Sequence, residues 1–201
     1  MNGDELVAAA RRPTTEWLES CFGPGTVWRP AEAELPQRLA DAGARAFLTT
    51  VGLPAVSLAF ADWDSTGLPA DGMWEEDPDE LFGNRTPDDD SPPVRLAYSI
   101  GTHQARHLML RGDTGTVEVY DPDGWDHACG YGGHAAGALP ELVGALGLLA
   151  RYEAGLTGDD ADAARAEFTA LLAELGQGPG DSSFWEHLLT SLEEEYGAWE
   201  D

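Results

Sequence analysis

The stretch VRLAYSIGTHQARHLMLRGDTGTVEVYD, residues 94–121, carries the clearest structural pattern in the chain. Its first part alternates apolar and polar residues, so that Val94, Leu96 and Tyr98 fall on one side, as in a half-buried β-strand. Two further short apolar runs follow on either side of a turn at Gly112–Gly115, and a tight turn of this kind joins neighbouring strands antiparallel. The stretch therefore predicts consecutive strands of a small, mainly antiparallel sheet.

The residues upstream predict one more strand and a pair of helices. The run AVSLAF, residues 55–60, alternates in the same way and is expected to add a strand to the sheet. Residues 14–23 begin with threonines that can cap a helix and end at a glycine, and residues 36–52 begin with a proline and end at a glycine. These two helices are expected to precede the sheet.

The residues downstream, from about 138 to 199, predict a block of C-terminal helices. Apolar side chains recur there every three or four residues, so each helix presents one apolar stripe. An amphipathic helix must bury its stripe, and the nearest apolar surface is the sheet. The 201 residues are therefore expected to form a single domain over residues 1–201, of the α+β class, with a central, mostly antiparallel sheet packed by N-terminal and C-terminal helices.

An acidic segment, DGMWEEDPDELFGNRTPDDDSPP at residues 71–93, separates two of the predicted strands. Like charges at this density repel one another, so the segment is expected to be an exposed loop insertion. Trp74 within it has two interpretations. It is either an aromatic anchor for a binding partner or a side chain that pins the loop to its own domain.

The chain as a whole is also strongly acidic. It has 37 acidic residues against 11 basic ones, all of them Arg, and a formal net charge of −26. Such a surface repels nucleic acid phosphates and anionic lipids and attracts cationic partners over long range, although acidity also serves solubility alone. Neither nucleic acid nor membrane is therefore expected as a partner.

The cysteines and the apolar segments bear on the compartment. Cys21 and Cys129 are too few for a disulfide framework, which fits a reducing compartment. The N-terminus has no apolar leader pattern, and no later segment is apolar enough to span a membrane. These features predict a cytoplasmic protein.

The stretch DPDGWDHACGYGGH, residues 121–134, resembles a reaction centre in its composition. A calcium loop of the EF-hand type needs Gly at its sixth position and Glu at its twelfth, where this stretch has Asp126 and Gly132. A metal-binding or enzymatic site remains an alternative, but no recognised ligand frame supports it, and a connection between a strand and a helix is favoured. The candidate ligands of the alternative are Asp121, Asp123, His127, Cys129 and His134.

No other catalytic arrangement is evident. The G-x-S-x-G nucleophile motif is absent, and the glycine run lacks the GK[ST] ending of a phosphate-binding loop. His103, His107 and His187 are expected to have structural or surface roles. The sequence therefore predicts no catalytic residue, no cofactor and no metal.

Four pieces of the sequence occur in a characteristic order. They are CFG at 21–23, RAFLTTVGLP at 45–54, YSIG with HLMLRGDTGTVEVYD between 98 and 121, and SSFWEHLLTSLEEE at 182–195. Together they resemble the SUKH immunity proteins of bacteria, within the SMI1/KNR4 superfamily, and most of all the SUKH-4 branch. The most specific pieces are Phe47–Pro54 and the Phe184–Trp185 pair.

The resemblance implies a SUKH-type α+β fold and a protein that binds and neutralises a polymorphic toxin, often a nuclease or deaminase domain, without enzyme activity or cofactor. A nuclease holds phosphates in a cationic cleft, which an acidic protein can occupy in place of the polyanion. An acidic regulatory scaffold, whose partner is not a toxin, remains a further alternative, as does binding through the outer face of the sheet. The candidate contact residues are Trp74, Glu75, Glu76, Asp77, Asp79, Glu80, Asp88, Asp89 and Asp90.

Overall fold

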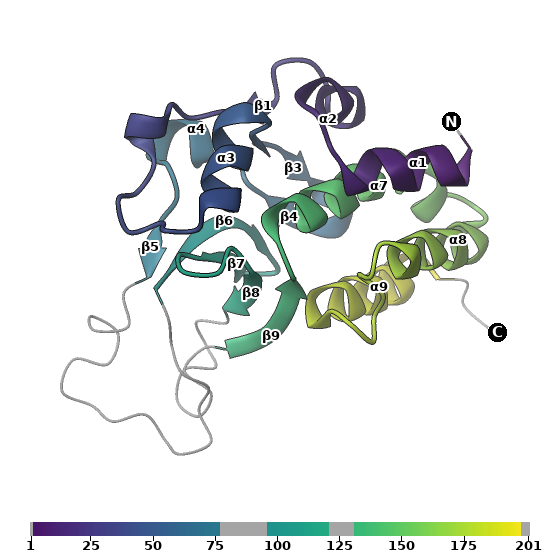
Figure 1. Ribbon diagram of the computed structural model, residues 1–201. Helices are drawn as coiled ribbons and strands as arrows, with labels where there is room; N and C mark the ends of the chain where they lie inside the picture. Colours follow the sequence, from purple (N-terminus) through teal and green to yellow (C-terminus); the bar gives the residue numbers. More distant parts are fainter. Residues whose placement is uncertain (1, 77–95, 121–130, 198–201) are drawn as a thin grey trace.

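The computed structural model describes residues 2–76, 96–120 and 131–197, which form an antiparallel sheet packed by helices (Figure 1). In this part of the chain the larger sheet has seven strands, in the order β3-β4-β6-β7-β8-β9, and β5 also pairs with β6. All of its pairings are antiparallel. The strands are β3 (Ser57–Leu58), β4 (Trp63–Asp64), β5 (Glu75–Glu76), β6 (Ala97–His103), β7 (Arg106–Arg111), β8 (Val117–Tyr120) and β9 (Tyr131–Ala136).

The strands β6, β7 and β8 confirm the pattern of residues 94–121. A two-residue turn joins β6 to β7, and Gln104 and Ala105 occupy it with φ values of 47° and 63°. Such positive φ values give the turn a twist that matches the twist of the flanking strands. The predicted glycine turn joins β7 to β8, with Gly115 at a φ of 71°.

A second, smaller sheet lies beside the first and was not predicted. It pairs β1 (Val27–Trp28) with β2 (Leu53–Pro54), and it connects α2 (Thr15–Phe22) with the end of α3 (Ala42–Thr50). Gly52 enters this sheet with a φ of 93°, and a Cβ there would lie 2.5 Å from the carbonyl oxygen of Trp28. Only glycine therefore allows this close crossing.

The hydroxyl of Ser65 connects the two sheets. It donates a hydrogen bond to the carbonyl oxygen of Pro54 at 2.7 Å, and it accepts hydrogen bonds from the Val56 amide at 3.1 Å and the Trp63 indole at 3.3 Å. Ser65 is only 4% exposed. One buried hydroxyl thus satisfies three polar groups that would otherwise be buried without a partner.

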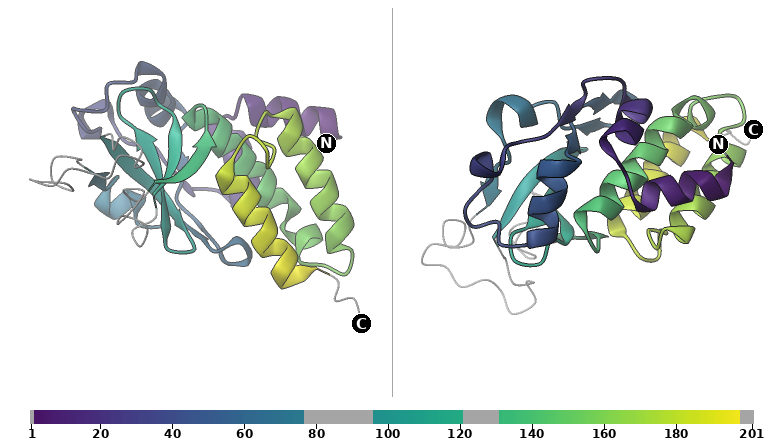
Figure 2. Two further views of the ribbon diagram at one scale, coloured as in Figure 1. Left: turned by 90° about the horizontal axis from the view of Figure 1, so that it is seen from below. Right: turned by 45° about the horizontal axis from the view of Figure 1, so that its top comes forward.

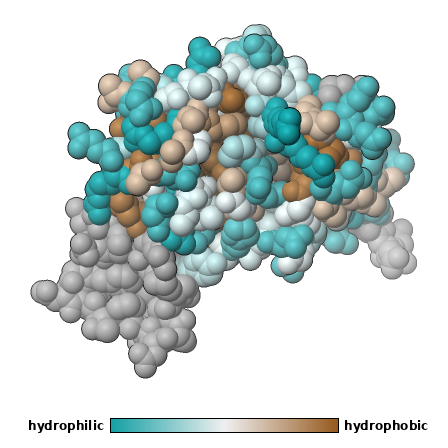
Figure 3. Space-filling model, viewed as in Figure 1, coloured by the Kyte–Doolittle hydropathy of each residue, from teal (hydrophilic) through white to brown (hydrophobic). Residues whose placement is uncertain are grey.

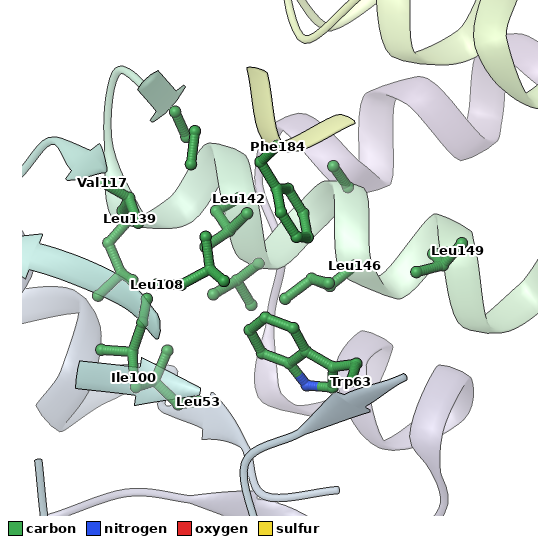
Figure 4. Close-up of a cluster of buried hydrophobic side chains, with 14 of the residues drawn as sticks. Leu53, Trp63, Ile100, Leu108, Val117, Leu139, Leu142, Leu146, Leu149 and Phe184 are labelled. Atoms are coloured by element: carbon green, nitrogen blue, oxygen red, sulfur yellow. The ribbon is translucent and has the colours of Figure 1, made fainter. Parts of the chain in front are cut away.

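The helix α7 (Leu139–Leu156) lies at the centre of the molecule. We call the face of the sheet that carries Leu108, Leu110 and Val117 the inner face. These side chains belong to the same buried cluster as the leucines of α7, and Figure 4 shows Leu108 and Val117 directed toward that helix. Every residue of α7 from Leu142 to Leu149 is buried. The sequence predicted one apolar stripe, but a helix that packs against neighbours all round has no polar side.

Helices from both ends of the chain surround α7 (Figure 2). Both α1 (Gly3–Arg11) and α2 contact it, as does α8 (Ala161–Glu174). The last helix, α9 (Ser183–Tyr196), packs against α8 and against β9, with Phe184 between the sheet and α7 (Figure 4). The remaining short helices are α4 (Leu68–Asp71), η1 (Glu32–Glu34) and η2 (Ala59–Ala61).

Glycines in α7 allow this crowding. A Cβ on Gly144 would overlap the backbone carbonyl of Ala10 in α1, and a Cβ on Gly147 would lie 2.5 Å from the indole ring of Trp17 in α2. The two glycines therefore set how closely α1 and α2 can approach the central helix.

Several sequence-based expectations were wrong in detail. The helix expected from residue 36 begins at Ala42, because the Asp41 side chain caps it by accepting a hydrogen bond from the Ala44 amide at 2.6 Å. The strand expected at residues 55–60 ends at Leu58, since the chain turns through η2 and returns as β4. The helix α1 was not expected at all.

Candidate functional site

The outer face of the larger sheet, opposite α7, carries polar and aromatic side chains from several strands. Side chains alternate along a strand, so the neighbours of Leu108 and Leu110 on β7, which are His107 and Met109, point to the outer face. Ser99 on β6 pairs with Met109, and Glu118 on β8 also pairs with it, which places both on this face.

Trp74 lies on this outer face. Its ring centroid is 5.1 Å from that of His107 and 6.3 Å from that of Tyr120, and its carbonyl accepts a hydrogen bond from the Ser99 amide at 2.7 Å. Trp74 nevertheless remains 49% exposed. The structure thus shows Trp74 packing on its own domain, while the interpretation as an anchor for a partner stays a prediction.

The first candidate acids follow Trp74 directly. Glu75 and Glu76 form β5 and pair with Tyr98 and Ala97 of β6, so part of the predicted loop at 71–93 is a strand. Arg38 forms a salt bridge with Glu75 at 3.3 Å, and both side chains are exposed, which makes the pair weak. The remaining candidate acids, Asp77, Asp79, Glu80, Asp88, Asp89 and Asp90, lie outside the described residues.

The His107 ring packs against the Trp74 ring. Its Nδ1 lies 2.9 Å from the hydroxyl oxygen of Ser99, which fixes the orientation of the ring. Burial lowers the pKa of His107, because the charged imidazolium loses its hydration. The ring that carries Trp74 is therefore neutral at physiological pH.

The end of the 121–134 stretch forms β9 rather than a strand-to-helix connection, and its glycines have a packing role. A Cβ on Gly133, which has a φ of 108°, would overlap the side chain of Ser183 at the start of α9. The preceding Ser182 caps α9 by accepting a hydrogen bond from the Trp185 amide at 3.3 Å, and it donates one to the Ala135 carbonyl of β9 at 2.8 Å. The glycines thus let the end of a helix dock against the edge strand.

Of the candidate metal ligands, the structure describes His134. His134 lies in β9 opposite Glu118. The other candidate ligands, Asp121, Asp123, His127 and Cys129, lie outside the described residues. Within the described ranges, no three His, Cys, Asp or Glu side chains are grouped so that they could hold a metal ion.

His103 at the end of β6 and His187 in α9 lie where these two elements meet. His103 is 2% exposed, and its Nδ1–H donates a hydrogen bond to the Ala61 carbonyl oxygen at 2.8 Å. Its ring centroid lies 5.5 Å from that of His187, whose Nε2 is 2.7 Å from Oε1 of Gln104. Burial lowers the pKa of His103. Both histidines therefore take part in the packing of α9 against the sheet.

Sequence reasoning missed Tyr120 and Tyr131 as surface residues. Tyr131 is 42% exposed, and the register places it opposite Tyr120, which in turn lies opposite His107. The outward positions of the strand pattern gave a signal for Tyr120. Tyr131 had none, because the strand that carries it was not predicted.

The face of the molecule shown in Figure 3 is largely polar. On the face shown in Figure 3, hydrophilic residues surround smaller apolar patches. No helix among residues 2–76, 96–120 and 131–197 has the length and apolar character needed to cross a membrane.

An antiparallel sheet packed by helices from both ends of the chain is an α+β fold of the SMI1/KNR4 type. A family model described as SUKH-4 immunity protein matches residues 13–191. The chain belongs to the SUKH-4 family of immunity proteins, as its resemblance predicted. No curated protein and no solved structure matches it. Family membership supports a role in toxin immunity, with a cognate toxin as the partner.

Proposed function

We propose that this protein neutralises a cationic toxin domain, of the nuclease or deaminase type, by covering its active-site cleft with an acidic surface. The protein acts in the cytoplasm as a stoichiometric inhibitor and needs neither enzyme activity nor a cofactor. The net charge of −26 favours this mechanism, because a protein of this charge associates quickly with a cationic cleft that normally holds phosphates.

The observation that carries the proposal is the half-exposed Trp74 on the outer face of the sheet, at the start of the segment that holds the candidate acids. Aromatic side chains are favoured at the centres of protein interfaces, and surrounding carboxylates supply charge complementarity at the rim. We assign the contact to Trp74 and to the acidic residues Glu75, Glu76, Asp77, Asp79, Glu80, Asp88, Asp89 and Asp90.

The proposal is tested by expressing the protein together with the toxin domain encoded beside its gene and measuring growth. The test variant converts the eight candidate acids to Asn or Gln. A matched control converts eight exposed acids near the other end of the molecule, and these are Asp159, Asp160, Glu174, Asp181, Glu186, Glu193, Glu194 and Glu195.

Both variants lose the same charge, so long-range attraction falls equally in the two. We expect the test variant to lose protection and the control to keep most of it. The Kd of the wild-type complex should also rise steeply with salt concentration, as expected for an interface between opposite charges. Equal protection by the two variants, with a Kd that salt does not change, would contradict the proposed contact.

A further inference from the structure

The exposed aromatic side chains gather on one face of the sheet. Within the described ranges, Trp74 and Tyr131 are the large apolar residues that remain strongly exposed. Residues that pair directly across strands point to the same side, so the register Tyr131–Tyr120–His107 continues the ring contact between His107 and Trp74. We call Trp74, His107, Tyr120 and Tyr131 the aromatic row.

A hollow of about 210 Å³ lies at the Trp74 end of the aromatic row. It follows the edge of β6 between two short partner strands, since β5 pairs with residues 97–98 and β4 with residues 102–103. Asp64, Asp71 and Trp74 all line it, and the described residues of its lining include no Arg or His. The opening therefore combines an indole ring with carboxylates.

One of these carboxylates is held in place by its own turn. Oδ1 of Asp64 accepts hydrogen bonds from the Thr66 amide at 2.9 Å and from the Thr66 hydroxyl at 2.8 Å. A fixed carboxylate loses little entropy when it binds a cation.

The arginine that β7 places on this face is already paired with carboxylates. Arg111 forms salt bridges with Asp113 at 3.0 Å and with Glu118 at 3.2 Å. His107 is neutral at physiological pH because it is half-buried. The aromatic row therefore adds no positive charge that would oppose a cationic ligand.

We infer that the aromatic row and the hollow together bind arginine side chains of the partner protein, with a guanidinium stacked at Trp74 and directed toward the carboxylates of Asp64 and Asp71. This inference rests on the proposed function and specifies the chemistry of the contact. A guanidinium is planar and weakly hydrated, so it stacks on aromatic rings and pairs with carboxylates at the same time. The ammonium group of lysine is compact and strongly hydrated, so it loses more hydration free energy when it leaves water.

The aromatic row also has the chemistry to stack nucleic acid bases, but the charge of the protein opposes this. Proteins that bind single-stranded nucleic acids by stacking combine aromatic rings with a positively charged groove, whereas this chain has a net charge of −26. An arginine-bearing protein segment is therefore the occupant that fits both the rings and the charge.

The first experiment measures the Kd of the catalytically inactivated toxin domain by calorimetry for the wild type, Trp74→Ala, Asp71→Asn and Tyr131→Ala. The control variants are Asp159→Asn, which removes the same charge in the connection between α7 and α8, and Tyr196→Ala, which removes the tyrosine at the end of α9. We expect the test variants to raise the Kd about tenfold for Trp74 and about threefold or more for the other two, with the controls within about twofold of wild type.

The second experiment does not depend on the toxin. N-acetyl-arginine amide and N-acetyl-lysine amide are titrated separately while the indole N–H signal of Trp74 is followed by NMR, with Trp74→Phe to assign the signal. We expect arginine to shift this signal at lower concentration than lysine does, and Asp71→Asn to weaken the arginine effect.

The outcomes separate the two proposals. If the toxin domain does not bind the wild type, the proposed function fails, and the arginine titration still decides the inference. If it binds and the Trp74 and Asp71 variants bind as tightly as wild type, the inference is overturned while the immunity role stands. Equal shifts with arginine and lysine, or a wild-type dimer that Trp74→Ala abolishes, would also overturn it.

Discussion

The substitution Gly144→Ala tests the packing of α1 on the central helix. The new methyl group would overlap the carbonyl oxygen of Ala10, which is backbone and cannot rotate away. Overpacking of this kind costs roughly 3 kcal/mol at the upper end of its usual range, and the gain in helix propensity from Gly to Ala returns about 1 kcal/mol. We therefore expect a net loss of about 2 kcal/mol, which for a chain of this size lowers the Tm by roughly 4–8 °C.

The assay is thermal and urea denaturation of the variant, with Gly155→Ala as a matched control in the same helix. A Cβ at Gly155 meets only the Cβ of Ala164, at 3.0 Å, so this variant should stay within about 1 kcal/mol of wild type. Because the loss in Gly144→Ala comes from α1, its amide hydrogens around Val7 should also exchange faster. A Gly144→Ala variant as stable as wild type would refute the reasoning, because α1 would then not be held at the distance that the structure shows.

Three further predictions concern stability. Ser65→Ala leaves the Val56 amide and the Trp63 indole buried without their partner, so denaturation should show a loss of about 1–3 kcal/mol, and an unchanged midpoint would contradict the role of the hydroxyl. Ser182→Ala removes the cap of α9, for which we expect a loss of about 1 kcal/mol in the same assay, whereas Ser182→Asn should recover part of it. Burial lowers the pKa of His103, so the unfolded chain binds a proton at this histidine more readily than the folded protein does. The free energy of unfolding therefore keeps its full value above about pH 6.5 and decreases as the pH falls from there toward the pKa of the folded state. An NMR titration should place the titration midpoint of His103 below 6.5, and a midpoint at or above 6.5 would argue against this.

The parts of the fold that the sequence predicted are those with a local signal. The strands β6 to β8 follow one another through short turns, so alternation within a few residues was enough to find them. The helices α7, α8 and α9 were found from their periodicity in the same way. The family resemblance added the correct class of fold and of function.

The parts that were missed depend on contacts between distant residues. The strand β9 has two glycines in its six residues and little β propensity, and it forms because β8 pairs with it on one side while α9 packs against it. The register of β1 with β2 joins residues 27–28 to residues 53–54, and no local pattern specifies it.

The candidate site shows the same division. Trp74 was identified from its acidic neighbours in the sequence, but its contact with His107 depends on how β5, β6 and β7 pair. The aromatic row could therefore not be predicted from the sequence, because its members come together only through the pairing of strands.

The central position of α7 also affects how the protein is made. The Arg11 side chain donates a hydrogen bond to the Glu174 carbonyl oxygen at 2.6 Å across a sequence separation of 163 residues. At a synthesis rate of about 5–20 residues per second, roughly ten seconds or more pass between translation of these two residues. For most of that time α7 is not yet translated, so Val7 and Leu18 in α1 and α2 lack the helix that buries them. The helices α1 and α2 are thus translated well before the helix that they pack against.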